Sequence, residues 1–176
     1  MRSRHFLITD THFGHRAMER LCGRPKGYED KILRNISNVV QEGDVLYHLG
    51  DFAWVQDRFW ANIYTSTSPA TNVLIRGNHD RRSIGWWLDH GFDVVADMLT
   101  LNAYGWKIYL THRPVNILGE MKSLVIHGHV HNTAHHKAAG YGHSIAFFIE
   151  HHYSPVSLAK IVDDYERGLR ESAKIS

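Results

Sequence analysis

The stretch from Val73 to Asp80, V-L-I-R-G-N-H-D, constrains the fold of this 176-residue chain more than any other. Its first four residues are mostly apolar, as in a buried parallel strand, and Gly77 then lets the backbone turn sharply. Asn78, His79 and Asp80 would follow at the carboxyl end of that strand, where ligands bind in open α/β sheets. Taken alone, G-N-H-D is also ordinary turn chemistry, so its meaning depends on how other strands end.

Four further apolar runs are followed by residues of the same kinds. Histidine and aspartate bind metal ions and move protons, and the chain has 15 histidines. The predicted strands cover 4–9, 45–49, 106–111 and 123–127, and they are followed by D-x-H at 10–12, G-D at 50–51, T-H at 111–112 and G-H-x-H at 128–131. The last motif is the strongest of these metal signals, because His129 and His131 alternate on one side of an extended segment.

Much of the remaining sequence has helical periodicity. Apolar residues recur at helical spacing in 29–41 and 56–64, and again after Ser154-Pro155, where the proline suits a first helical turn. A helical segment is predicted at 81–88, strands are predicted at 93–103 and 143–150, and a basic excursion loop is predicted at 16–28. Strands that alternate with helices indicate the α/β class.

Length and composition exclude several classes of protein. One domain that spans residues 1–176 is expected, because the chain has little room for a second. The net charge of +2 permits nucleic-acid binding without requiring it. Cys22 is the only cysteine, the N-terminal apolar run is too short for a signal peptide, and no stretch is long enough to span a membrane. We therefore expect a cytoplasmic protein without membrane contact.

The order and spacing of the five clusters, from Asp10 to His131, resemble those of the calcineurin-like metallophosphoesterases. Small bacterial and phage members are most similar, since their first motif also continues as D-T-H-F-G-H. The resemblance implies a sandwich of two mixed β-sheets flanked by helices. It also implies two divalent transition metal ions, one bound by Asp10, His12, Asp51 and His131 and the other by Asn78, His112, His129 and again Asp51. Nitrogen and oxygen ligands without thiolate suit Mn²⁺, Fe²⁺, Zn²⁺ or Ni²⁺ better than Ca²⁺. The donor set does not choose among these four ions, and Mn²⁺ is the expected one.

The same resemblance assigns roles beside the ligands. His79 matches a histidine that protonates the leaving oxygen, Asp80 would orient it, and a hydroxide that bridges the ions would attack phosphorus. Apart from the resemblance, Arg81 could hold the substrate phosphate, since guanidinium groups match phosphate oxygens, although a surface role would equally explain it. Arg113 stands where the family pattern leads us to expect another type of residue, and it is a candidate local contact to the substrate phosphate. His15 has no place in the ligand pattern and is predicted to be a buried structural histidine.

We therefore expect a metal-dependent phosphoric ester hydrolase that acts on a small or nucleotide-like phosphoester. A diester is favoured, because its leaving alkoxide needs a proton and so gives His79 a purpose, whereas a monoester has a looser transition state. A nuclease and a phosphomonoesterase remain alternatives that use the same site, and nucleic acid remains a candidate partner. A scaffold that binds partner proteins without turnover is the alternative from another class, but it should lack ligands that this chain retains. The sequence makes no prediction of the oligomeric state.

Overall fold

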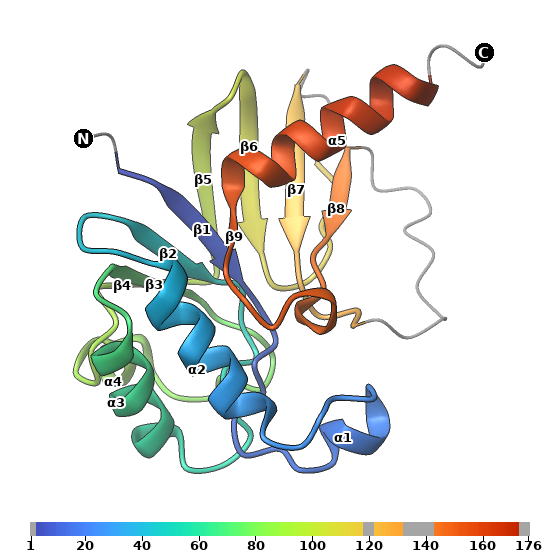
Figure 1. Cartoon of the computed structure of the whole chain (residues 1–176). Helices are drawn as coiled ribbons and strands as arrows, with labels where there is room; N and C mark the ends of the chain where they lie inside the picture. Colours follow the sequence, from blue (N-terminus) through green and yellow to red (C-terminus); the bar gives the residue numbers. More distant parts are fainter. Residues whose placement is uncertain (1–2, 118–121, 132–142, 173–176) are drawn as a thin grey trace.

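In the computed structural model, which describes residues 3–117, 122–131 and 143–172, the strands form two sheets (Figure 1). The first has the strand order β4-β3-β2-β1-β9, with only β9 antiparallel to its neighbour, and the second has the order β5-β6-β7-β8, with only β5 antiparallel. The strands are β1 (His5–Ile8), β2 (Val45–His48), β3 (Thr71–Ile75), β4 (Val94–Ala96), β5 (Met98–Ala103), β6 (Trp106–Thr111), β7 (Ser123–His127), β8 (Ser144–Ala146) and β9 (Val156–Ser157). The predicted α/β sandwich of two mixed sheets is confirmed.

Helices cover the outer face of the first sheet. α2 (Tyr28–Val39), α3 (Asp57–Thr67) and α4 (Ile84–Leu88) pack there, whereas α5 (Leu158–Ser172) contacts β1 and β9. The two short helices are α1 (Met18–Leu21) and the 3₁₀ turn η1 (Ile149–His151). Within the described ranges, no helix has the length and apolar character needed to cross a membrane.

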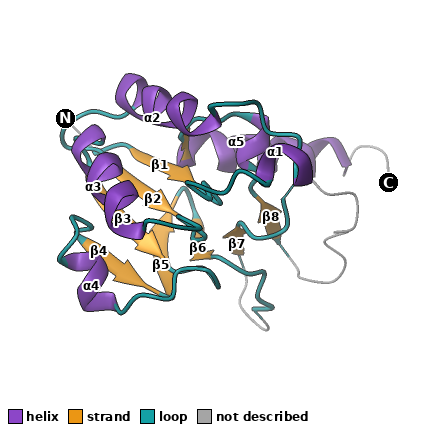
Figure 2. Cartoon of the chain, turned by 90° about the horizontal axis from the view of Figure 1, so that it is seen from below, coloured by secondary structure: helices purple, strands orange, loops and turns teal. Residues whose placement is uncertain are grey.

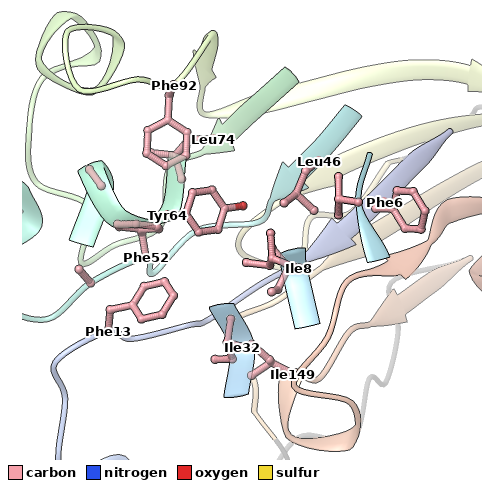
Figure 3. Close-up of a cluster of buried hydrophobic side chains, with 14 of the residues drawn as sticks. Phe6, Ile8, Phe13, Ile32, Leu46, Phe52, Tyr64, Leu74, Phe92 and Ile149 are labelled. Atoms are coloured by element: carbon pink, nitrogen blue, oxygen red, sulfur yellow. The ribbon is translucent and has the colours of Figure 1, made fainter. Parts of the chain in front are cut away.

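Alternation along the strands of the first sheet divides the core into two clusters. Phe6 and Ile8 of β1 point toward the helices, together with Leu46 and Leu74 from the next two strands (Figure 3). Leu7 points the other way, into a cluster shared with the inner face of the second sheet and with α5. A strand buried on both faces needs apolar residues at every position, which explains the continuous runs in the sequence.

Three predicted elements differ from the structure. The predicted strand 93–103 is two strands, since β4 pairs with β3 in the first sheet and β5 pairs with β6 in the second. The predicted strand 143–150 ends at Ala146 and is followed by η1. The basic loop 16–28 contains α1, and Arg24 within it is buried rather than solvated.

The helices near 81–88 and at the carboxyl end begin later than their sequence signals suggested. α4 begins at Ile84, because the Ser83 side chain accepts a hydrogen bond from Trp86 N and caps it. α5 begins at Leu158, since Ser154-Pro155 leads first into β9, and the Ser157 hydroxyl accepts from Lys160 N at 3.2 Å. The predicted positions of these helices are right and their first residues are wrong.

Candidate metal centre

The polar clusters that follow the strands meet at one edge of the two sheets. β1, β2 and β3 are parallel neighbours, so their carboxyl ends place the clusters at 10–12, 50–51 and 77–80 side by side. Asp10 N donates to Gly50 O at 2.9 Å and His12 N donates to Asp51 O at 3.0 Å, which joins the first two loops beyond the strands (teal in Figure 2). β6 and β7 of the second sheet bring residues 112 and 128–131 to the same edge.

In the described residues, side-chain ligand atoms converge in three groups: first Asp10, His12 and His131, second Asp51, His112 and His129, and third Cys22, His131 and Glu150, which shares His131 with the first. His12 Nε2 lies 3.3 Å from His131 Nε2 and 3.9 Å from Asp10 Oδ1. Asp10 Oδ1 is buried and has no hydrogen-bond partner in the described part of the chain. Asp10 Oδ2, in contrast, accepts from Thr9 Oγ1 at 2.6 Å and from His129 N at 3.0 Å. The protein thus holds one carboxylate oxygen and leaves the other for a cation.

Asp51, His112 and His129 form the second group. His112 Nε2 lies 3.3 Å from Asp51 Oδ2, 3.2 Å from His129 Nδ1 and 3.1 Å from Asn78 Oδ1. Asp51 Oδ2 also lies 3.7 Å from His12 Nε2 of the first group. This one oxygen is therefore positioned between the two groups.

The spacing and chemistry of these atoms fit divalent metal ions. Ligands bound at about 2.0–2.2 Å in tetrahedral or octahedral arrangements lie roughly 3.0–3.5 Å from one another. The nitrogen and oxygen atoms here are 3.1 to 3.9 Å apart. Imidazole nitrogens with carboxylate and amide oxygens are the donor set of transition metals rather than of Ca²⁺. The structure thus brings together all seven residues predicted as ligands: Asp10, His12, Asp51, Asn78, His112, His129 and His131.

Five of these residues have backbones in the left-handed region. Their φ angles are 48° for Asp10, 45° for His12, 53° for Asp51, 71° for His129 and 43° for His131. Residues other than glycine rarely adopt positive φ, and each such residue costs on the order of 1–3 kcal/mol. Strain of this kind gathers at functional sites, because the surrounding structure must hold it in place.

Neighbouring residues supply that support. A side chain at Gly77 would collide with Asp51, and one at Gly128 would collide with Thr9. The Asp80 carboxylate accepts hydrogen bonds from the backbone N–H groups of Asp51 (2.8 Å), Phe52 (2.9 Å) and Gly77 (2.7 Å). Asp80 was expected to orient His79, but its carboxylate holds the backbone of the Asp51 loop, and no hydrogen bond joins it to the His79 ring within the described residues.

A second layer of contacts orients the ligating rings. His112 Nδ1 lies 2.8 Å from Leu49 O, which makes Nδ1 the donor and leaves the Nε2 lone pair available to a metal ion. His131 Nδ1 lies 3.1 Å from Glu150 Oε1, an arrangement that strengthens a ligating imidazole. Glu150 in turn pairs with Arg24, whose Nη2 is 2.6 Å from Oε1 and 2.7 Å from Asp10 O. Arg24 therefore ties the loop that begins at Asp10 to Glu150.

Burial and charge set the ionisation of these groups. Burial lowers the pKa of His12 to about 2 and the pKa of His129 to about 4, so both rings are neutral and able to bind a metal. Burial alone would raise the pKa of the Asp51 carboxyl, but its hydrogen bond with His112 lowers it. For His131, burial alone would lower the pKa, but hydrogen bonds with Cys22 and Glu150 raise it to about 10. A metal ion must displace that proton to bind.

The model of the calcineurin-like phosphoesterase superfamily domain matches residues 4–148 of the chain. The chain belongs to this superfamily. An uncharacterized protein of Methanocaldococcus jannaschii is 29% identical over 178 residues, which cover 93% of this chain and 92% of that protein. The crystal structure of a protein of unknown function from Aquifex aeolicus is also 29% identical, with a TM-score of 0.73, and the match covers 92% of this chain and 98% of that one.

In this calcineurin-like domain, two cavities lie beside the ligand groups. One, of about 480 Å³, is lined by His79 and Arg81 together with Trp54, Asp57 and Arg82. The other, of about 310 Å³, is lined by Asn78, His112 and Arg113 among others. Arg113 Nε donates to Asn78 Oδ1 at 3.4 Å, and His79 Nε2 lies 3.8 Å from Asp51 Oδ2. The two predicted phosphate-binding arginines thus belong to different cavities.

Several residues at the site were not predicted from the sequence. Arg24 and Glu150 carried no motif, and only their burial reveals them. His15 was predicted to be buried, but it is half-buried, and its ring stacks on Trp54 with centroids 4.1 Å apart. Trp54 is exposed beside His79, with ring centroids 4.8 Å apart. His15 ends the motif D-T-H-F-G-H, but no sequence signal distinguished Trp54 from other aromatic residues.

Proposed function

We propose that this chain is a dimetal phosphodiesterase in which Asp51 is shared between two divalent ions. The position of Asp51 Oδ2, between His12 Nε2 at 3.7 Å and His112 Nε2 at 3.3 Å, carries the proposal. Asp10, His12 and His131 would complete the first site, and Asn78, His112 and His129 the second. When bound, two such ions supply a nucleophile from water at neutral pH and neutralise charge on the phosphate. Mn²⁺ is our first choice, with Fe, Zn and Ni as alternatives.

His79 is the proposed general acid for the leaving oxygen. Its backbone N–H donates to Asp51 Oδ1 at 2.9 Å, which fixes the residue against the shared ligand. Its side chain is 29% exposed and lines a cavity, so its ring can reach a bound substrate. A proton on His79 Nε2 would pass to the oxygen that leaves phosphorus. Arg113 would hold a non-bridging phosphate oxygen from the other side, near Asn78.

The two cavities favour a diester over a monoester. A phosphate diester carries two ester groups, and the cavities beside His79 and beside His112 offer one space for each. A monoester needs only one of them. A nuclease and a phosphomonoesterase are the competing activities at this site.

The test compares parent protein and His79→Ala after loading with Mn²⁺. We expect His79→Ala to retain both ions. Its kcat should fall by about 10²–10⁴-fold for a methyl phosphodiester, whose alkoxide leaving group needs a proton, and by less for a p-nitrophenyl ester, whose p-nitrophenolate leaves without one. His5→Ala is a matched control, because His5 lies at the far end of β1 and contacts Tyr47. Equal losses on both leaving groups would exclude the acid role.

Substrate class is tested separately. We expect kcat/KM to be higher for bis-p-nitrophenyl phosphate and a 2′,3′-cyclic nucleotide than for p-nitrophenyl phosphate. A clear preference for the monoester would overturn the diesterase proposal and leave the metal centre intact. Two bound ions without turnover of any of these esters would favour a non-catalytic scaffold.

A further inference from the structure

The cavity that His79 lines is where a leaving group would lie if His79 is the general acid of the proposed function. A general acid must lie next to the oxygen that it protonates, so the wall that carries His79 faces the departing group. The cavity measures about 480 Å³. Small-molecule sites occupy about 300–1,000 Å³, so a nucleotide-sized group is within its capacity.

Trp54 offers this cavity a fixed aromatic surface. It is 47% exposed and lines the cavity. The His15 ring stacks on the indole at an interplanar angle of 7°, and Trp54 N donates to Phe13 O at 3.0 Å. The His15 ring covers one face of the indole and the backbone bond anchors the residue, while 47% of Trp54 stays exposed. An exposed, rigid aromatic side chain is a stacking platform for a planar base.

The charges in the cavity favour an anionic group. Arg82 is neutralised by Asp57, whose Oδ2 lies 2.7 Å from Arg82 Nε. Arg81 lines the same cavity, and in the described ranges its guanidinium makes no ion pair. The cavity therefore carries one net positive charge, from two arginines and one aspartate. A cationic leaving group would be repelled, whereas a phosphate would find a guanidinium donor.

We propose that this cavity is a leaving-group subsite for a nucleotide, whose base stacks on Trp54 and whose own phosphate contacts Arg81. The inference rests on the proposed phosphodiesterase function and names its substrate class as an internucleotide phosphodiester. Water is added across the linkage. The water oxygen bonds to phosphorus, and the P–O bond to the departing nucleotide breaks. The departing oxygen takes a proton from His79, and the proton lost by the attacking water restores His79.

The test uses three dinucleotide substrates with Mn²⁺, and bis-p-nitrophenyl phosphate as the reference. The first is thymidylyl-thymidine. In the second, hydrogen replaces the base of the leaving nucleoside, and in the third, the leaving nucleoside carries an additional phosphate. Chromatography of the products identifies which nucleoside leaves.

We expect the parent to prefer the substrate with the base by about fivefold or more in kcat/KM. Stacking of one base on an aromatic side chain is worth roughly 5- to 150-fold in affinity. Trp54→Ala should abolish this ratio and Trp54→Phe should retain most of it. Tyr104→Ala is a matched control, since Tyr104 is 49% exposed in the turn between β5 and β6, before the start of β6. Arg81→Gln should remove any gain from the additional phosphate, whereas Arg34→Gln, exposed on α2, should keep it.

Three outcomes would overturn the subsite. One is a parent that hydrolyses bis-p-nitrophenyl phosphate but does not distinguish the dinucleotide with the leaving base from the one without it, which leaves the proposed function standing. Another is a Trp54→Ala variant that slows all substrates equally, because Trp54 would then only position His79. If bis-p-nitrophenyl phosphate is not hydrolysed, the proposed function fails, and binding of thymidine 3′,5′-bisphosphate decides the subsite. Equal affinity for parent and Trp54→Ala would then reject it, and a loss of about fivefold or more would support it.

Discussion

Glu150→Gln tests whether the buried pair behind the first metal group positions His131. Glu150 Oε1 accepts from Arg24 Nη2 at 2.6 Å and lies 3.1 Å from His131 Nδ1. The Glu150 side chain is 2% exposed and that of Arg24 is fully buried. Glutamine preserves the size and an acceptor oxygen but removes the charge. The effect of the substitution is therefore almost purely electrostatic.

The expected loss of stability depends on the hydrogen-bond partners that Arg24 keeps in the variant. Removal of one member of a buried ion pair costs about 3–5 kcal/mol, because the other charge stays buried. Arg24 keeps two carbonyl acceptors, Asp10 O at 2.7 Å and Thr11 O at 2.8 Å. We therefore expect the lower end of this range, a loss of about 3 kcal/mol in the free energy of unfolding of the metal-free protein. Loss of a carboxylate behind a ligating histidine weakens metal binding by about 10–100-fold.

The weaker metal binding should be confined to the first group. Glu150 contacts His131 of the first group, whereas His112 in the second group is oriented by Leu49 O. Urea denaturation measures the stability of metal-free protein, and calorimetric titration with Mn²⁺ resolves the two affinities. Glu42→Gln, at an exposed residue, is the matched control and should change neither. Equal weakening of both affinities, or a stability loss below about 1 kcal/mol, would refute the positioning of His131 by this pair.

Three further substitutions have distinct expected results. Asp51→Asn should lower bound metal at both positions, and elemental analysis that found two ions at full occupancy would contradict the shared ligand. Gly128→Ala should displace Asp10 and cost about 1–3 kcal/mol, because its Cβ would collide with Thr9 and Asp10, whereas Gly168→Ala on α5 has open space and should stabilise slightly. Asp44→Asn should cost about 1 kcal/mol at neutral pH, since the bond with Arg4, which is 48% exposed, lowers the pKa of Asp44. Such a carboxylate stabilises the fold above its unfolded pKa of about 4, so the difference from the parent in thermal unfolding should shrink as the pH falls below that value.

The strand ends were predictable because parallel strands impose their own geometry. Runs such as Val45 to Leu49 and Val73 to Arg76 are apolar on both faces, which indicates a buried strand, and adjacent parallel strands must end at the same edge. Once β1, β2 and β3 are neighbours, their polar ends lie close together. The meeting of these polar clusters at one edge therefore followed from the order of the strands, whereas their assignment as metal ligands came from the family resemblance. The role of each ligand remains a proposal.

Two other features, the Arg24–Glu150 pair and the change of sheet at Asp97, depend on contacts between residues far apart in the sequence. Arg24 and Glu150 lie 126 positions apart, and neither belongs to a periodic pattern, yet their pairing connects the loop after β1 to η1. The crossing between sheets at Asp97 was missed for a similar reason. Residues 93 to 103 read as one extended run, and only the pairing partners show that two different sheets share it.

The strained backbones of the candidate ligands explain why turn chemistry and metal chemistry look alike in the sequence. Asp10 and Asp51 follow their strands with φ near +50°, a conformation that aspartate tolerates better than most residues, so the D-x-H and G-D motifs also fit ordinary turns. In an ordinary turn the side chain would bond its own backbone. Here Asp80 supplies the acceptor for the backbone around Asp51, and Thr9 and His129 hold only one oxygen of Asp10. Asp10 Oδ1 and Asp51 Oδ2 are thereby kept from hydrogen bonds with their own loops. The strained backbones direct these two oxygens toward histidines of the other loops.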